Sequence, residues 1–211
     1  LQMENSQITA LFDNDKAQHA GWGRHQSVAI GSSKLFVKRV PMTEIERDNF
    51  LSTRNLYNLP AYYHYGIGSA GHGVWRELVT HLKTTNWVLS DEIESFPLLY
   101  HYRIMLWSGE RMAVDEAWQQ RYVTHWGGNE QIGQYMLDRT NAKYEMVLFL
   151  EHIPHTLHPW LSEHPDQVER VLDDLHTTFD FLRKNDILHL DAHFYNMLTD
   201  GERVYLTDFG L

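Results

Sequence analysis

The sequence predicts an α+β protein built in two parts, a sheet-rich front and a helical back. Alternating or β-branched runs, which are typical of strands, occupy residues 27–31, 34–40, 96–106 and 143–153. After Pro154 the apolar residues take up helical spacing, most clearly over residues 166–186. We therefore place the boundary between the two parts at residues 151–155.

The first two strand segments are predicted to form a hairpin, because a Gly-Ser-Ser turn joins them. Lys38 lies on the second of these strands, and Pro41 is expected to end it. Thr43 and Glu46, three residues apart, form the sequence pattern of a capping box. A helix of roughly a dozen residues over 44–56 is expected to follow.

Two helical regions flank the third strand segment. A glycine-rich link leads into residues 74–89, whose apolar residues recur at near-helical spacing and which carry Glu77. Residues 107–141 contain two helix-like stretches separated by Gly-Gly-Asn. We interpret this segment as a helical insertion between strands.

The back of the chain predicts one long helix, then a polar loop and a short strand. Pro165 opens the helix. Its apolar stripe contains Val168, Val171, Leu172, Leu175, Phe179 and Leu182. Asp191 and Asn196 fall on the loop that follows the helix, and Asp208 ends the strand after an Asp-Gly turn.

Composition narrows the classes of partner and the compartment. The chain has 211 residues, a formal net charge of -10 and no basic run, which argues against nucleic acid as a partner. Cysteine is absent, which excludes a disulfide framework and fits a reducing compartment. No apolar stretch reaches the ~18 residues of a membrane span, and the first residues do not resemble a signal peptide. We expect a soluble, cytoplasmic protein without a membrane partner; composition leaves the oligomeric state open.

The polar residues near the end of the chain follow one order. His189, Asp191 and Asn196 form H-x-D-x-x-x-x-N, and Asp208 begins D-F-G. Phosphoryl transfer from ATP requires a carboxylate at the acceptor hydroxyl, and oxygen ligands that hold magnesium. Asp and Asn also favour turns for local hydrogen bonding alone. That preference does not account for the order of these residues, so the sequence predicts a phosphotransferase site.

HLDAHFYN followed by TDFG resembles the protein-kinase-like superfamily, which includes eukaryotic-type protein kinases and the aminoglycoside and choline phosphotransferases. The resemblance implies a bilobal fold, with residues 1–153 as an antiparallel-sheet small lobe. Residues 154–211 would begin a mainly helical large lobe that continues beyond the end of this sequence. Asp191 matches the aspartate that orients and deprotonates the acceptor hydroxyl. Asn196 and Asp208 match the metal-binding amide and carboxylate, so ATP and Mg²⁺ are the implied cofactors.

The same resemblance gives Lys38 a role at the ATP phosphates, paired with a glutamate on a helix. We prefer Glu77 as that partner, because its helix immediately precedes a strand, as the family's pairing helix does. Glu46 is the alternative, and it also fits a simple capping residue. Gly21 and Gly23 precede a strand at the position of the phosphate-covering loop, although the full G-x-G-x-x-G is missing.

LFLEHIP resembles the strand that leads into the hinge between the lobes, where backbone groups hold adenine. By this resemblance Leu150 is the gatekeeper residue. Glu151 would offer its carbonyl, and Ile153 its amide and carbonyl. The alternative interpretation of this segment is an ordinary buried strand.

The acceptor is the least determined part of the prediction. We expect a protein Ser or Thr hydroxyl, since D-F-G is typical of protein kinases. Leu190 replaces the arginine that receives a phosphorylated activation loop in regulated kinases, so control by that route is expected to be absent. His193, a further catalytic candidate, stands where small-molecule phosphotransferases of the superfamily often carry histidine. A small-molecule hydroxyl is therefore the alternative acceptor, and a catalytically silent nucleotide-binding scaffold is the third hypothesis.

Overall fold

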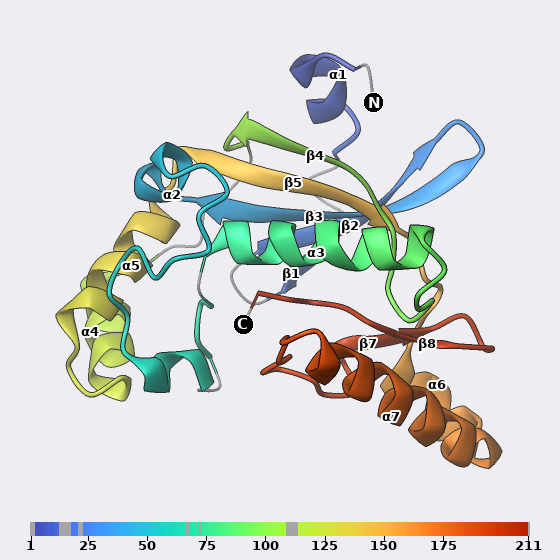
Figure 1. Ribbon diagram of the computed structural model, residues 1–211. Helices are drawn as coiled ribbons and strands as arrows, with labels where there is room; N and C mark the ends of the chain where they lie inside the picture. The colour runs from blue at the N-terminus through green and yellow to red at the C-terminus, as the bar shows by residue number, and fades with distance from the viewer. Residues whose placement is uncertain are drawn as a thin grey trace.

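The computed structural model describes residues 3–12, 18–20, 23–65, 68–71, 73–108 and 114–210, with the backbone alone for residues 18–20, 64 and 65. Within these residues, two antiparallel sheets and the helices packed against them make an α+β fold, as the sequence predicts (Figure 1). The boundary predicted at residues 151–155 falls between the last strand of the larger sheet and the first strand of the smaller one.

The larger sheet has the strand order β1-β2-β3-β5-β4, and its neighbouring strands are antiparallel. The strands are β1 (Gln18–Ala20), β2 (Gly23–Ile30), β3 (Ser33–Met42), β4 (Leu99–Leu106) and β5 (Tyr144–Glu151). The predicted hairpin is confirmed as β2 and β3. The prediction that Pro41 ends its strand is wrong, because β3 continues to Met42. β2 pairs with β3 only as far as Arg39, so Pro41 has a neighbouring strand on one side alone, where a missing N–H is tolerated.

Different helices cover the two faces of this sheet. Alternate residues of β3 point to opposite faces: Val37 packs in a cluster with Ile8 of α1 (Asn5–Thr9), whereas Val40 packs with residues of α3 (Val74–Leu89). Figure 1 shows α1 above the sheet and α3 below it. Lys38 lies an even number of residues from Val40, so its side chain emerges on the face that α3 covers.

The predicted capping box forms at the start of α2 (Glu44–Asp48). The Thr43 hydroxyl accepts a hydrogen bond from the Glu46 amide, and the Glu46 carboxylate accepts one from the Thr43 amide. The helix is much shorter than the predicted residues 44–56, because the chain leaves the helical conformation at Asn49 (φ -113°, ψ 63°). The Asn49 side-chain amide donates back to a helix carbonyl. Asparagine side chains that bond nearby backbone in this way compete with helix continuation.

The two helices predicted within residues 107–141 are α4 (Glu116–His125) and α5 (Glu130–Thr140). Asp115 and Asn129 cap them by accepting hydrogen bonds from backbone amides of the first turn. A small separate core joins these helices to η1 (Ala61–Tyr65) and its neighbours; it contains Leu59, Tyr63, Ala70, Trp126, Ile132 and Tyr135. In Figure 1 this unit lies at the end of the larger sheet, beside α2.

The smaller sheet has the order β6-β7-β8 and packs with the last helices. The elements are β6 (His155–Thr156), α6 (Leu157–Glu163), η2 (Pro165–Gln167), α7 (Val168–Lys184), β7 (Met197–Thr199) and β8 (Val204–Leu206). α7 is the predicted long helix, and Val171, Leu175 and Leu182 of its stripe are buried. Val168 and Leu172 are exposed, since they lie at the margin of that stripe, so the buried face is narrower than predicted.

Across the described residues, no helix combines the length and apolar character needed to cross a membrane.

Candidate active site

A cleft of about 520 Å³ lies between the larger sheet and the β7–β8 hairpin. Among the residues named from the sequence, those that line it are Gly23, Lys38, Leu150, Glu151, Ile153, Asn196 and Asp208. Glu77 lies behind Lys38, while Asp191 and His193 belong to the loop that leads to Asn196. Gly21 is outside the described residues. The structure thus brings together residues that are more than a hundred positions apart in the chain.

Lys38 holds two carboxylates from distant parts of the chain. Its Nζ lies 2.5 Å from Glu77 Oε1 on α3 and 2.7 Å from Asp208 Oδ1, just after β8. The Glu77 side chain is 4% exposed, whereas that of Asp208 is 44% exposed. Of the two candidate partners for Lys38, Glu77 is therefore the one in contact, and Glu46 bonds backbone amides instead.

The Lys38 ammonium and the Asp208 carboxylate stabilise each other's charged form, whereas burial raises the pKa of Glu77. Burial alone would lower the pKa of Lys38, but the nearby carboxylates of Asp208 and Glu77 outweigh burial and raise it. The Lys38 ammonium lowers the pKa of Asp208, an effect larger than the opposing effect of burial. Lys38 is therefore charged and Asp208 ionised at neutral pH, with the exposed carboxylate directed toward the cleft.

The loop before β7 is fixed to the segment that carries Asp208. His189 Nε2 donates to the Thr207 carbonyl over 2.8 Å, and the Thr207 amide donates to the Asn196 carbonyl over 3.3 Å. His189 Nδ1 accepts from the Asp191 amide over 3.3 Å. One ring nitrogen thus donates and the other accepts, as in a neutral imidazole, and burial lowers the pKa of His189 accordingly. This histidine holds the residue next to Asp208 and the Asp191 backbone together.

Asp191 and Asn196 are oriented by direct contact. Asn196 Nδ2 donates to Asp191 Oδ2 over 2.9 Å and to the Asp191 carbonyl over 3.1 Å. Asp191 Oδ1 lies 3.7 Å from His193 Nε2, and both side chains are well exposed. Asp191 therefore presents a carboxylate oxygen to solvent beside Asn196, which lines the cleft.

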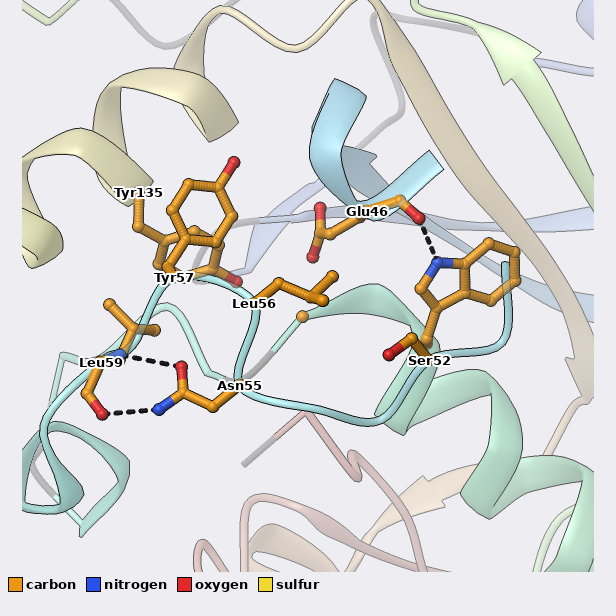
Figure 2. A pocket seen from close by; sticks show the side chains of 9 residues that line it. Glu46, Ser52, Asn55, Leu56, Tyr57, Leu59 and Tyr135 are labelled. Carbon is orange, nitrogen blue, oxygen red and sulfur yellow. Dashed lines mark hydrogen bonds between the residues drawn. The ribbon is translucent and has the colours of Figure 1, made fainter. Parts of the chain in front are cut away.

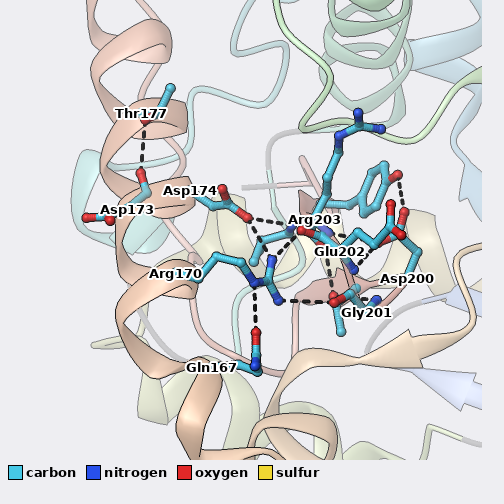
Figure 3. Close-up of polar contacts among 12 residues, drawn as sticks. Gln167, Arg170, Asp173, Asp174, Thr177, Asp200, Gly201, Glu202 and Arg203 are labelled. Atoms are coloured by element: carbon cyan, nitrogen blue, oxygen red, sulfur yellow. Dashed lines mark hydrogen bonds and ion pairs between the residues drawn. The ribbon is translucent and has the colours of Figure 1, made fainter.

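A network on α7 supports the hairpin that connects Asn196 to Asp208. The Arg170 guanidinium donates to the carbonyls of Gly201 and Glu202 at the hairpin turn, and its Nε donates to Gln167 Oε1 over 3.1 Å. Asp174 accepts from the Val204 amide over 3.3 Å. Figure 3 shows these contacts running from one face of α7 to the turn. The β7–β8 hairpin is therefore held by contacts between α7 and its turn, in addition to the hydrogen bonds between its two strands.

β5 ends at the back of the cleft, where Glu151 bonds twice to Leu98. The Glu151 amide donates to the Leu98 carbonyl over 2.8 Å, and the Leu98 amide donates to Glu151 Oε2 over 3.1 Å. Leu150 is buried and lines the cleft with Phe36 and Leu198. Sequence reasoning missed Phe36, although its position two residues before Lys38 on one strand face was a usable signal.

The roof of the cleft comes from β2. Gly23 begins this strand and lines the cleft. His25 pairs with Lys38 in the strand register, and its ring centroid lies 5.2 Å from that of Phe36. Burial, and then the Lys38 charge, lower the pKa of His25. No sequence motif pointed to the side chain of this histidine; the register of the hairpin places it beside Lys38.

The oxygen atoms at the cleft fit the magnesium ion that the family resemblance implies. Mg²⁺ prefers hard oxygen ligands and commonly takes only one or two from the protein beside phosphates and water. Among the described residues, Asp208 Oδ2 and Asn196 Oδ1 make no hydrogen bond or ion pair, since the contacts of these side chains use their other atoms. One carboxylate and one amide oxygen therefore remain to hold the ion.

No protein-family model matches this chain, and no curated protein matches it in sequence.

Proposed function

We propose that the chain is an ATP- and Mg²⁺-dependent phosphotransferase with a hydroxyl acceptor, built as a bilobal kinase-like fold. The observation that carries this proposal is the triad in which Lys38 contacts Glu77 from α3 and Asp208 from the segment after β8. An ion pair between such a lysine and helix glutamate, together with a metal-binding aspartate, is what phosphoryl transfer in kinases requires. The cleft volume and its apolar wall of Phe36 and Leu150 suit a nucleotide base.

Each residue then has a role set by its position. Lys38 offers a fixed positive charge to phosphate oxygens, and Glu77 holds that charge in place. Asp208 and Asn196 would hold Mg²⁺, which supplies neutralisation of the phosphate charge. Asp191, oriented by Asn196, accepts the proton of the acceptor hydroxyl. As it does so, the hydroxyl oxygen bonds to the γ-phosphorus, and the bond between that phosphorus and ADP breaks. His193 beside Asp191 contacts the acceptor side.

A protein Ser or Thr hydroxyl remains the first acceptor class, with a small-molecule hydroxyl as the second. His193 favours the second class, because an exposed imidazole beside the base can bond a polar acceptor. The two classes share the same chemistry at the phosphate, so only an acceptor assay separates them.

The test is transfer of radiolabelled phosphate from ATP to mixed protein and small-molecule acceptors, with Asp191→Asn compared with the parent. Asparagine can still accept the Asn196 hydrogen bond but cannot take a proton. Turnover should fall by about 10² to 10⁴-fold, while the Mg-ATP thermal shift persists. Equal turnover would reject Asp191 as the base, and a parent that binds Mg-ATP without transferring phosphate would support the silent scaffold.

A further inference from the structure

The start of α3 determines where Glu77 lies. Glu77 stands in the first turn of this helix, which begins at Val74. The N-cap residue is Gly73 (φ 104°, ψ 157°), which has no side chain to bond the free amides of that turn. A helix that carries a site residue in its first turn therefore lacks a local cap.

Glu46 of α2 supplies the missing cap from a distant part of the chain. Its Oε1 accepts from the Val74 amide over 3.0 Å, and its Oε2 accepts from the Thr43 amide over 2.7 Å. The Glu46 carbonyl also accepts from Trp75 Nε1 over 2.6 Å, a contact that Figure 2 shows beside the carboxylate. One buried carboxylate, in a residue 2% exposed, thus caps α2 and α3 at once.

The surroundings leave this carboxylate little freedom. A Cβ added at Gly73 would lie 2.6 Å from Glu46 Oε1, so only glycine permits the approach. Tyr57, Tyr135 and Glu46 line one small cavity, in which Figure 2 places the two aromatic side chains next to Glu46. The buried guanidinium of Arg139 on α5 interacts electrostatically with Glu46 and donates to the Tyr135 hydroxyl over 2.8 Å. The helical insertion therefore contributes a buried positive charge that attracts the Glu46 carboxylate.

We propose that Glu46 is a positioning residue that fixes the first turn of α3 and thereby holds Glu77 against Lys38. This inference rests on the proposed phosphotransferase function for its kinetic consequence, but its structural consequence stands apart from it. Glu46 is the glutamate that the sequence offered as the alternative to Glu77 for the direct partner of Lys38. Its contacts instead let it act on Lys38 indirectly, through the helix that carries Glu77.

The kinetic test is a double-mutant cycle of Glu46→Gln and Glu77→Gln. Glutamine keeps one acceptor oxygen, but its amide group faces a backbone N–H and loses that bond. Glu46→Gln should lower kcat by about 10- to 100-fold through misplacement of Glu77, and should add little once Glu77 is already glutamine, because coupled sites are not additive. Glu44→Gln is the matched control, since this exposed glutamate of the same helix pairs with Lys143 at the surface. Additive losses, or a Glu46→Gln rate equal to the control, would overturn the inference.

The structural test needs no activity. The chain contains no cysteine, so spin labels can be placed at Ser32→Cys in the β2–β3 turn and Leu82→Cys on the exposed side of α3. Glu46→Gln, and separately Gly73→Ala, should shift or broaden the distance distribution while Glu44→Gln leaves it unchanged. An unchanged distribution in both test variants overturns the inference. A parent without phosphoryl transfer but with these shifts would reject the proposed function and keep the positioning role of Glu46.

Discussion

At the scale of single residues, the two carboxylates on Lys38 differ in what they are free to do. Glu77 is buried and directed at the ammonium, whereas Asp208 keeps one oxygen free and is partly exposed. A carboxylate with a lowered pKa stays ionised and can meet a cation at no further protonation cost. Asp208 is therefore suited to a metal, and Glu77 to holding the lysine.

We predict that Asp208→Asn abolishes the Mg²⁺-dependent part of the thermal shift produced by ATP. Asparagine has nearly the same shape but no charge, so the ion loses its only carboxylate ligand in the proposed site. A ligand at about 100 times its Kd stabilises a protein by about 2.7 kcal/mol, so the loss is readily measured by calorimetry. Asp191→Asn is the comparison, since the same chemical change at the base should leave the shift in place. A shift that survives Asp208→Asn would contradict the metal role.

At the scale of elements, contacts within one turn of the chain could be predicted from the sequence, whereas contacts between distant elements could not. The capping box of Thr43 and Glu46 is readable because both partners lie within one turn. The second hydrogen bond of Glu46, to Val74, joins residues 28 positions apart, and no local pattern announces it. The prediction that Pro41 ends its strand failed because it considered the proline alone. A proline ends a strand only where a backbone N–H at that position would have to bond a neighbouring strand.

We predict that Arg170→Lys weakens the attachment of the β7–β8 hairpin to α7. A lysine cannot bond Gln167, Gly201 and Glu202 together, since its ammonium lacks the planar fork of a guanidinium. The free energy of unfolding should fall by about 1–2 kcal/mol in urea denaturation. Arg183→Lys on the same helix is the control, because the Arg183 guanidinium pairs with Asp180 at an exposed position. Equal effects of the two substitutions would show that the hairpin is held by other contacts.

At the scale of the whole molecule, the sequence shows the order of the polar residues near the end of the chain, but not which distant residues they meet in the fold. His189, Asp191 and Asn196 lie within one loop, so their spacing alone predicts that they are neighbours. Lys38 reaches Asp208 across 170 positions only because the β3 face, α3 and the β8 end converge on one cleft. That convergence depends on packing between elements, which periodicity in one element cannot specify.

The same convergence buries a histidine between α3 and the D-F-G segment. His81 is fully buried, neither of its ring nitrogens has a hydrogen-bond partner within the described chain, and its ring meets the Phe209 ring edge-on at 5.0 Å. Burial, and then the Lys38 charge, lower the pKa of His81 to about 3, against a weaker opposite effect of Asp208. The imidazole is therefore neutral in the folded protein at every pH at which an unfolded histidine titrates.

We predict that His81 makes the folded state sensitive to acid. With its folded pKa below the unfolded value of 6.5, the unfolded chain binds the extra proton, so stability falls as pH drops through the unfolded value. Between about pH 7 and pH 5 the loss from this one residue should be about 2 kcal/mol. The His81→Leu variant should not show this part of the stability loss. Both proteins should keep the pH dependence that comes from the other histidines with lowered pKa values, which are His25, His101, His152 and His189. Urea unfolding of both proteins at the two pH values measures the difference. Parallel pH dependence would mean that protonated His81 is accommodated without separating α3 from Phe209, whereas the predicted difference would locate part of the molecule's acid sensitivity at that contact.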